Sequence, residues 1–424
     1  MARIVIAAVG SLGDLHPSLA VARALAERGH SPVIATHPGY RARVAAAGLE
    51  FAPVRPDFEV TGDLKEVLKL AMHETRGSMY VVRELVLPHV RASYTDMLTA
   101  TEGADAIVTH MLSFAGVLVA EQHGLPRITP ILQPMVLLSA YDPPVMPTAP
   151  DATWMRHMGP AMWKLLWQLA RATSRGWFGE VDALRKEIGL PASKAHPMFD
   201  GFSPLLNLAL FPSVLAQPQP DWPANTIVTG LCRYDRDEAG AGMPLVLREF
   251  LDAGSPPIVF TLGSSGVYNP EGFYRAAAEA AAAVGRRSVL LVGPQPEAFA
   301  TALPADCLVI HYAPHSDLMP RAAAIVHHGG AGTTGHALAA GRPMVIVPFS
   351  HDQPDNAARC ERLGVARVVR RKQLSAATLT AALREVLEDP RIATRAAEIG
   401  AIVSAEDGAR TAAAAIERVL AAKR

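Results

Sequence analysis

The chain has 424 residues, enough for two or three domains, and its 50% hydrophobic and 19% charged residues exclude an intrinsically disordered protein. Lysine plus arginine number 40, as do aspartate plus glutamate, so the net charge of zero argues against a dedicated nucleic-acid binder. Three widely spaced cysteines fit a reduced, cytoplasmic protein. The sequence has no run of about 18 apolar residues, the length that would predict a membrane span. Peripheral contact with a membrane surface stays compatible with this composition.

Short apolar runs alternate with alanine- and leucine-rich amphipathic stretches in the first half, which is typical of strand–helix units around a parallel sheet. A strand is expected over Arg3–Val9, followed by the turn Gly10–Asp14 and a helix from about Pro17 to Gly29. Further strands are expected at 32–36, 107–109 and 127–131, with a helix at 114–122. These elements predict one doubly wound domain.

The proline-rich segment 217–223 predicts an extended connector between two domains, because proline lacks the amide that a central strand needs. A second series of units follows, with strands expected at 258–262, 288–292, 308–311, 324–327 and 344–348 and helices at 270–284, 335–340 and 405–423. The second half therefore predicts a second doubly wound domain.

An insertion over residues 134–202 interrupts the first domain and holds four of the five tryptophans. Two interpretations stay open here: ordinary packing of helices on the sheet, or a pliable apolar pocket for a flat or lipid-like ligand. The residues that we select as candidates for an acceptor pocket are Met79, Phe114, Met135, Trp163 and Trp167.

A glycine-rich turn, HHGGAGTT over 327–334, follows the expected strand 324–327. Its glycines allow a ligand to approach the backbone, while exposed amides, the dipole of the next helix and the threonine hydroxyls favour an anion. The turn therefore predicts a cradle for a diphosphate. The earlier turn Gly10–Asp14 departs from the dinucleotide pattern GxGxxG, and no acidic residue ends the next strand, so dinucleotide binding is not expected.

Four C-terminal motifs together resemble the sugar-donor signature of family 1 nucleotide-sugar-dependent glycosyltransferases: 311–315, 327–334, 341–343 and 351–357. The sequence GSLGDLHPSLAVARALAERGH is similar to the opening motif of that family. Within the family, the chain looks closest to bacterial rhamnosyltransferases of the rhamnolipid type and to bacterial enzymes that glycosylate flavonoids and other small aglycones. The resemblance implies an α/β fold of the GT-B type, with two doubly wound Rossmann-like domains facing across a cleft.

The resemblance also implies roles for single residues. Tyr312 would stack on the nucleobase, His328 and Thr333 would hold the diphosphate, and Asp352 and Gln353 would hydrogen-bond the sugar hydroxyls. The remaining candidates for binding the nucleotide sugar are Gly13, Gly263, Ser264, Gly330, Gly332, Thr334 and His336. The nucleotide sugar is a co-substrate, and no further cofactor is expected.

Position 336 departs from the family pattern. Plant members carry a glutamate there, which accepts hydrogen bonds from both ribose hydroxyls, whereas this chain has His336. A pentose without a 2′-hydroxyl would not need that acceptor, which favours dTDP-rhamnose, with UDP-glucose as the main alternative. A His336 that simply faces solvent is the other interpretation.

The resemblance places Asp14 at the position of the catalytic base, which is a histidine in plant and macrolide-modifying members and also an aspartate in bacterial ones. His16 and His110 are the other candidates. His110 ends a strand where relatives place the partner of the base, so either an Asp14/His110 pair or a purely structural His110 fits the sequence. A free aspartate has a pKa of about 3.9 and a phenol one of about 10, so proton transfer must be concerted with glycosyl attack.

The sequence Asp235-Arg236-Asp237 has the form of a metal-binding DxD element, but it lies in a polar connector, and we expect no metal. The chain is thus expected to be an inverting, metal-independent glycosyltransferase that moves a hexose or 6-deoxyhexose to a hydroxyl of an apolar small molecule, either phenolic or lipid-like. A GT-B nucleotide-sugar epimerase and a non-catalytic auxiliary partner of another transferase are the alternatives.

Four parts of the chain follow from this interpretation. Residues 1–216 are expected to bind the acceptor, and 217–255 to form the connector and the start of the second domain. Residues 256–404 are expected to bind the nucleotide sugar, and 405–424 to form a helix that packs back on the first domain.

Overall fold

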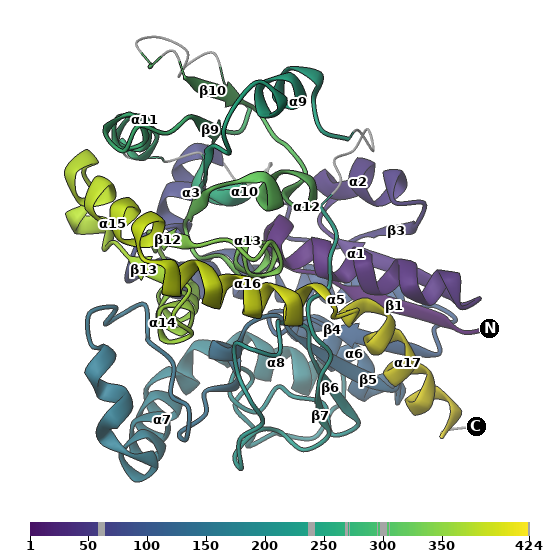
Figure 1. Cartoon of the computed structure of the whole chain (residues 1–424). Helices are drawn as coiled ribbons and strands as arrows, with labels where there is room; N and C mark the ends of the chain where they lie inside the picture. The colour runs from purple at the N-terminus through teal and green to yellow at the C-terminus, as the bar shows by residue number, and fades with distance from the viewer. Residues whose placement is uncertain are drawn as a thin grey trace.

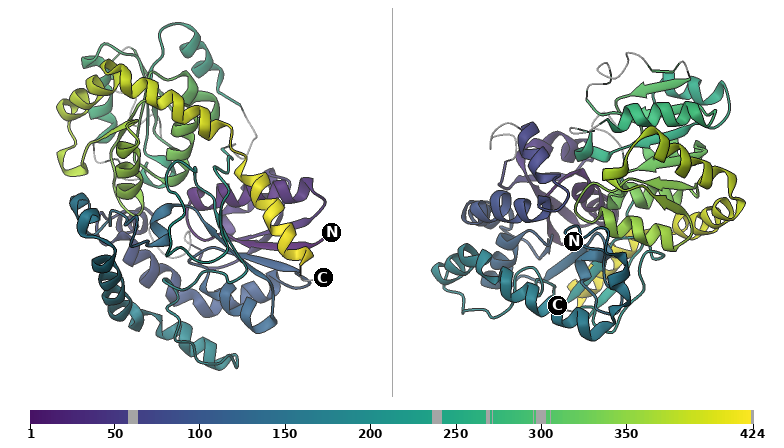
Figure 2. Two further views of the ribbon diagram at one scale, coloured as in Figure 1. Left: turned by 60° about the horizontal axis from the view of Figure 1, so that its bottom comes forward. Right: turned by 90° about the vertical axis from the view of Figure 1, so that its left-hand side faces the viewer.

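Two sheets of parallel strands, each flanked by helices, form the two lobes of the molecule (Figures 1 and 2). The computed structural model describes residues 1–57, 64–235, 242–267, 270, 272–294, 296, 303–304 and 306–422. Among these residues, no helix has the length and apolar character needed to cross a membrane.

The first sheet has the strand order β3-β2-β1-β4-β5-β6-β7, and every neighbouring pair is parallel. Its strands are β1 (Arg3–Ala7), β2 (Ser31–Thr36), β3 (Glu50–Pro53), β4 (Ala106–Thr109), β5 (Arg127–Ile131), β6 (Leu206–Ala209) and β7 (Thr226–Val228). The strand order reverses direction between β1 and β4, and ligands of such sheets bind beyond the carboxyl ends of the strands at this switch point.

Helices of the first lobe surround this sheet and form the insertion. They are α1 (Leu12–Glu27), η1 (Pro38–Tyr40), α2 (Arg41–Ala46), α3 (Leu64–Ala71), α4 (Gly77–Tyr80), η2 (Val81–Val86), η3 (Leu87–His89), α5 (Val90–Ala100), α6 (Phe114–His123), η4 (Pro134–Leu137), η5 (Thr153–Met158), α7 (Pro160–Ser174), η6 (Arg175–Phe178) and α8 (Gly179–Glu187).

The second sheet has the order β10-β9-β8-β11-β12-β13 and is also parallel throughout. Its strands are β8 (Ile258–Thr261), β9 (Ser288–Leu291), β10 (Cys307–Ile310), β11 (Ala324–His327), β12 (Met344–Ile346) and β13 (Ala366–Val368). The order reverses between β8 and β11, so the glycine-rich turn after β11 lies at this sheet's switch point.

The helices that follow Val228 are α9 (Leu245–Asp252), α10 (Gly263–Gly266), α11 (Phe273–Ala283), α12 (His315–Leu318), η8 (Met319–Arg321), α13 (Ala331–Ala339), α14 (Gln353–Arg362), η9 (Arg371–Gln373), α15 (Ala376–Glu388), α16 (Pro390–Ser404) and α17 (Gly408–Ala421). The last of these, α17, leaves the second lobe and lies beside α1 of the first (Figure 1).

Three boundaries differ from the expectations. Helix α1 begins at Leu12 and not near Pro17, because Ser11 and Asp14 form a capping box at its first turn. Helix α13 begins at Ala331 and not at Gly335, so the threonines of the glycine-rich turn lie on the helix. The proline-rich segment 217–223 joins β6 to β7 of one sheet, so the first sheet continues past residue 216 and the chain leaves it only after Val228.

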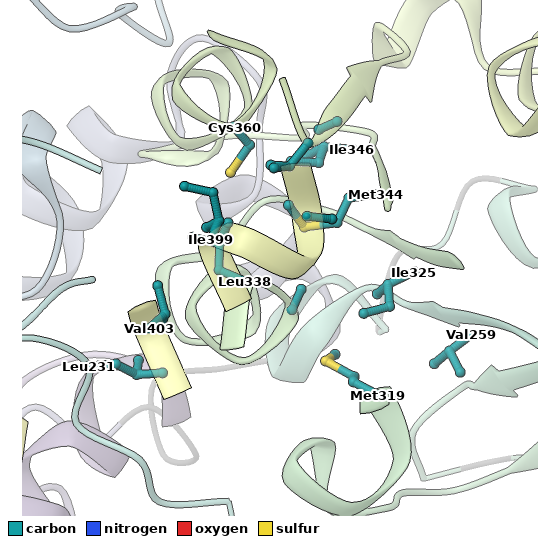
Figure 3. Close-up of a cluster of buried hydrophobic side chains, with 14 of the residues drawn as sticks. Leu231, Val259, Met319, Ile325, Leu338, Met344, Ile346, Cys360, Ile399 and Val403 are labelled. Atoms are coloured by element: carbon teal, nitrogen blue, oxygen red, sulfur yellow. The ribbon is translucent and has the colours of Figure 1, made fainter. Parts of the chain in front are cut away.

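The helices α13 and α16 pack over the second sheet and bury one side of it. Figure 3 shows Leu338 of α13 and Ile399 and Val403 of α16 in the same cluster as the strand residues Val259, Ile325, Met344 and Ile346. These side chains are at most 2% exposed. Close packing on this face fixes α13, and with it the turn that precedes the helix.

The return of the chain to the first lobe is held by one glutamate. Glu406 accepts hydrogen bonds from the amide of Ser213 at 2.9 Å and from the amide of Leu231 at 2.9 Å. The Gly408 amide donates to the Leu231 carbonyl at 3.1 Å, and a methyl group on Gly408 would collide with the Gly230 carbonyl. The segment that leaves the first lobe, at Leu231, and the segment that returns to it, at 406–408, therefore lie against each other between the lobes.

Candidate active site

The turn after β1 folds the Asp14 carboxylate back over the backbone. The Ser11 amide donates to Asp14 Oδ2 at 2.7 Å, and Gly10 has a φ of +134°. A methyl group on Gly10 would collide with Asp14 Oδ2. One carboxylate oxygen thus serves the helix cap, and the other, Oδ1, lies 3.4 Å from His110 Nε2.

The orientation of His110 indicates which group of this pair can take a proton. The Leu112 amide donates to His110 Nδ1 at 3.3 Å, so Nδ1 acts as an acceptor and Nε2 carries the hydrogen. That N–H faces Asp14 Oδ1, and His110 is buried while Asp14 is 25% exposed. The two residues thus form the pair that the sequence left open, with the Nε2 hydrogen of His110 directed at the Asp14 carboxylate.

His16 lies apart from this pair. Its ring packs 5.5 Å from that of Tyr234, centroid to centroid, on the segment between the lobes. Burial lowers the pKa of His16 to about 4, and the charge of Arg43 acts in the same direction. Its Nε2 is buried without a hydrogen-bond partner among the described residues. Of the three candidates for the base, the structure brings together Asp14 and His110.

Glycines from two segments, the glycine-rich turn and α10, pack closely around the His328 ring. A methyl group on Gly263 of α10, where φ is +67°, would lie 2.5 Å from His328 Cε1, and one on Gly330 would collide with His328 Nε2. A methyl group on Gly332 would meet nothing within 4 Å. Two glycines are therefore required by the histidine itself, while Gly332 leaves open space at the start of α13.

Several polar atoms around this turn are buried without a partner among the described residues: His328 Nδ1, Thr334 Oγ1 and Asn356 Oδ1. Burial lowers the pKa of His328 to about 4, so its ring is neutral at pH 7 and acts through hydrogen bonds and not through charge. An unpartnered buried polar group costs about 1–3 kcal/mol. Several at one turn point to a polar ligand, and Thr333 is buried beside them in the first turn of α13.

Asp352 and Gln353 begin helix α14, and their side chains are already engaged. Asn356 Nδ2 donates to Asp352 Oδ2 at 2.6 Å, while Gln353 Oε1 accepts from the amides of Phe349 and Ser350 at 2.8 and 3.1 Å. The oxygen of Gln353 is thus used by the turn before α14. The sequence interpretation assigns the Gln353 side chain to a sugar hydroxyl, and its Nε2 group takes no part in these two bonds.

The expected base and the expected sugar-binding carboxylate influence each other across the lobes. Burial, together with the negative charges of Asp14 and Asp355, raises the pKa of Asp352 to about 7. Asp14 likewise acts on the pKa of His351, which burial lowers. Asp14 belongs to the first lobe and Asp352 to the second, and these influences agree with the contact of the lobes beside Asp352, where Ser78 Oγ lies 2.9 Å from His351 Nδ1.

The expected nucleobase end of the site forms a second polar group. The Tyr312 hydroxyl donates to the Asp235 carbonyl, and Asp235 accepts from the Ser316 amide at 2.6 Å. His336 is buried, with its Nδ1 3.9 Å from Asp235 Oδ2 and its ring 5.8 Å from that of His315. The interpretation that His336 faces solvent is wrong, because α13 turns the ring toward Asp235.

The DxD interpretation can be followed only at Asp235, since Arg236 and Asp237 lie outside the described residues. The Asp235 carboxylate binds the amide and hydroxyl of Ser316. Within the described ranges, no group of three or more histidine, cysteine, aspartate or glutamate side chains is arranged to hold a metal ion.

The remaining candidates for the sugar-donor side lie at loop ends. Gly13 is exposed in the first turn of α1, where its amide donates to Ser11 Oγ at 3.2 Å, and Ser264 is half-buried at the start of α10.

The five acceptor candidates fall into two groups. Phe114 and Trp163 are core residues: Phe114 packs edge-on against Phe178 at 5.4 Å, and the Trp163 indole N–H donates to the Met155 carbonyl at 3.0 Å. Met79, Met135 and Trp167 keep exposed surface, and the Trp167 indole nitrogen is buried without a partner in the described part of the chain. For Trp163, packing therefore accounts for the burial.

Sequence reasoning did not single out two residues that shape the site. Asn356 ties Asp352 to the glycine-rich turn by donating also to the Gly329 carbonyl at 2.9 Å. His351 has a φ of +57°, and its Nδ1 lies 2.9 Å from Ser78 Oγ of α4. The spacing of Asn356 four residues after Asp352 was a usable signal, whereas nothing local predicts the contact between positions 78 and 351.

Comparisons with known proteins agree with this fold. Residues 4–141 match the glycosyltransferase family 28 N-terminal domain, and residues 278–417 match the erythromycin biosynthesis protein CIII-like C-terminal domain. O-mycaminosyltylonolide 6-deoxyallosyltransferase of Streptomyces fradiae is 34% identical over 431 residues, which cover 98% of this chain and 97% of that protein.

A sterol 3-beta-glucosyltransferase of Emericella nidulans is 30% identical over 430 residues, and the chain spans 29% of its length. The solved structure of the glycosyltransferase VinC in complex with dTDP superimposes with a TM-score of 0.69 at 21% identity, covering 99% of this chain and all of that one. The two family matches, the full-length relative and the shared architecture lead to one conclusion: the chain belongs to the family 1 glycosyltransferases, with the GT-B fold of two Rossmann-like domains.

Proposed function

We propose that the protein is an inverting, metal-independent hexosyltransferase that moves a 6-deoxyhexose or hexose from a nucleotide sugar to a hydroxyl of an apolar small molecule in the cytoplasm. The observation that carries this proposal is the contact between the lobes beside Asp352, where Ser78 Oγ of α4 lies 2.9 Å from His351 Nδ1. The charge of Asp14 in the first lobe acts on both His351 and Asp352, which supports a shared site for the expected proton acceptor and the residue expected to hold the sugar. The first sheet would then bind the acceptor and the second the nucleotide sugar.

In the proposed reaction, the acceptor oxygen attacks the anomeric carbon while its proton passes to Asp14 Oδ1. The bond between that carbon and the diphosphate oxygen breaks, and the electron pair leaves with the nucleotide diphosphate. Asp14 later releases the proton to solvent. The Nε2 hydrogen of His110 faces the same oxygen and stabilises the carboxylate before the transfer.

The leaving diphosphate would lie at the start of α13. There the free amides of the first helical turn point toward an anion, and neutral His328 and the hydroxyls of Thr333 and Thr334 add hydrogen-bond donors. These groups stabilise developing charge without a metal, so we expect activity to survive EDTA.

A dTDP sugar is the preferred co-substrate in this proposal, and dTDP-rhamnose is the first choice. His336 is buried at the expected pentose end and, as a neutral imidazole, offers one acceptor nitrogen where a glutamate would offer two oxygens. The relatives support the choice, since one is named a 6-deoxyallosyltransferase and VinC was solved with dTDP. UDP-glucose is the alternative, and the sterol glucosyltransferase is the relative that favours it.

Calorimetric titration tests the nucleotide preference directly. We expect dTDP to bind within about tenfold of UDP or more tightly, because a missing pair of hydrogen bonds is worth about 1–3 kcal/mol. His336→Glu should move the preference toward UDP. A wild-type preference for UDP of far more than tenfold would contradict the argument from position 336.

Product analysis with dTDP-rhamnose and a panel of phenolic and lipid-like alcohols separates the proposal from an epimerase with the same fold. A glycosylated acceptor supports transfer, and free sugar isomers without it support epimerisation. An auxiliary partner protein would give neither product.

A further inference from the structure

Helix α14 has two polar faces that point to different parts of the molecule. Asn356 holds the glycine-rich turn through the Gly329 carbonyl. Asp355, Arg359 and Arg362 are spaced four and three residues apart and therefore share a second face. That second face meets residues of the first lobe, more than 200 positions earlier in the chain.

The contact on the second face is a buried ion network. Asp355 Oδ1 accepts from the Val145 amide at 3.0 Å, and Asp355 Oδ2 accepts from Arg359 Nε at 2.8 Å. The guanidinium of Arg359 also pairs with Asp142 and donates to the Leu215 carbonyl at 3.0 Å. The side chains of Arg359 and Asp355 are 2% and 1% exposed. The charges of Arg359 and Asp355 are thus compensated and withdrawn from water, while the Asp142 side chain stays 24% exposed.

The loop 139–145 is also anchored to its own lobe. The carboxylate of Asp221 accepts from Ser139 Oγ and from the Ala140 amide, both at 2.6 Å. Within the insertion, the loop leads from η4, which carries Met135, toward α7. It therefore spans the two lobes and is fixed on both sides.

An ion network of this kind is a poor device for stability alone. Replacing a buried ion pair by well-packed apolar residues is often neutral or stabilising, whereas an ion network requires one particular geometry. Here the fixed geometry relates the start of α14, with Asp352 and Gln353, to the loop on the acceptor side.

We propose that Arg359 is a positioning residue that couples the two substrate sites: nucleotide binding at α14 strengthens the hold on loop 139–145 through Asp355 and Asp142, and so prepares the acceptor side. This inference rests on the proposed function, since it takes the ligand at α14 to be a nucleoside diphosphate. The coupling makes binding on the acceptor side depend on occupancy of the nucleotide site.

Hydrogen exchange of the Val145 amide, with and without saturating dTDP, measures the coupling in the full chain. Residues 143 and 144 are prolines, so Val145 is an isolated reporter next to Asp142. We expect dTDP to slow its exchange by about tenfold or more in the wild type, the size expected for a strengthened hydrogen bond to a charged group. In Asp142→Asn, this slowing should fall below about threefold while the dTDP affinity stays within about threefold of wild type.

Arg359→Lys is the second variant, because lysine keeps the charge but lacks the planar fork that reaches Asp355, Asp142 and Leu215 together. Asp182→Asn is the matched control. It removes a carboxylate of the same insertion that pairs with Arg175 at 2.8 Å and not with a residue of α14. The control should keep the wild-type response to dTDP.

The outcomes separate the inference from the proposed function. If the wild type binds neither dTDP nor UDP, the proposed function fails and the coupling falls with it. If dTDP binds but leaves Val145 exchange unchanged, or if both network variants respond like the wild type, the coupling is refuted and the proposed function stands. A merely structural network would raise exchange equally in the free and the bound protein of each variant.

Discussion

The turn around His328 and the insertion that carries α7 are both rich in unusual residues, yet they are built on opposite principles. Around His328, glycines at 263 and 330 leave no room for a side chain, and several polar atoms are buried without partners in the described structure. On α7, Leu165 and Leu169 are 58% and 59% exposed, and Trp154 on the preceding η5 is 65% exposed. The first region combines close packing with buried polar atoms, as a site for a polar ligand would, whereas the second exposes large apolar side chains.

This difference teaches which half of a transferase can be inferred from its residues. A site for a shared co-substrate needs particular atoms at particular places, so single substitutions should be costly there. A site for a variable acceptor needs apolar area, which many sequences supply.

The largest effect is expected where the two halves meet, at Asp14. Asp14→Asn should lower turnover of a phenolic acceptor by roughly 10²–10⁴ because it removes the proton acceptor, while its amide oxygen can still accept from the Ser11 amide. Steady-state kinetics and dTDP titration check this, and dTDP affinity should not change. Asp105→Asn is the control, since that carboxylate accepts from the Arg3 amide. Near-normal turnover by the Asp14 variant would reject the assignment and return attention to His16.

Tryptophan substitutions in the insertion test whether it is a core or a pocket. Trp163→Ala should destabilise the protein by roughly 3–5 kcal/mol, because the ring is 3% exposed and its N–H is bonded to Met155. Trp167→Ala should cost less and alter acceptor preference, since Trp167 is only half-buried. Denaturant unfolding together with an acceptor screen distinguishes the two. A stable Trp163→Ala protein with a changed acceptor range would contradict the assignment of Trp163 to the core.

The pH dependence of stability tests the polar half. The pKa of Asp352 is about 7 in the folded chain and about 3.9 in the unfolded one, so between these values the native state binds the extra proton and stability falls as pH rises. Asp352→Asn removes this titrating group. Its free energy of unfolding should therefore rise by about 1–3 kcal/mol relative to that of the wild type as the pH goes from 5 to 8. Denaturant titrations at both pH values measure it. Asp182→Asn, with a side chain 43% exposed, should show no such trend, and a flat difference for Asp352→Asn would refute the assignment.

The smallest effects should separate two glycines of the same turn. Gly330→Ala should destabilise the protein by about 1–3 kcal/mol because its methyl group meets the His328 ring. Gly332→Ala should leave stability unchanged or slightly improved, since a methyl there meets nothing and alanine favours a helix. Gly332→Ala should nevertheless weaken dTDP binding in a titration if the diphosphate approaches this backbone. Wild-type affinity in that variant would place the ligand elsewhere on α13.

The fold could be predicted well where strands are buried on both faces. The runs 258–261 and 324–327 are short, apolar and followed by glycine turns, and both are strands of the second sheet. The start of α13 could not be predicted from the sequence, because glycines and threonines have low helix propensity and the helix is stabilised there by tertiary packing. The continuation of the first sheet past the proline-rich segment 217–223 could not be predicted, because an edge strand as short as β7 leaves almost no pattern.

The candidate site shows the same division. Asp14, His328 and Asp352 could be chosen from motifs, because their chemistry is local to one turn each. The contact between Arg359 and Asp142 joins positions 217 residues apart, and the partner of His351 lies 273 residues away. Single-sequence patterns carry no information on such distances, so the network that joins the lobes appears only in the folded chain.

The paired passage of the chain at Gly230 and Glu406 constrains how the enzyme can open. Because the outgoing and returning segments are hydrogen-bonded to each other there, the two passages of the chain between the lobes form one connection. Sliding one lobe past the other would break the hydrogen bonds of Glu406. A rotation about this connection would instead act against the other contacts between the lobes, those of Arg359 with Asp142 and of His351 with Ser78.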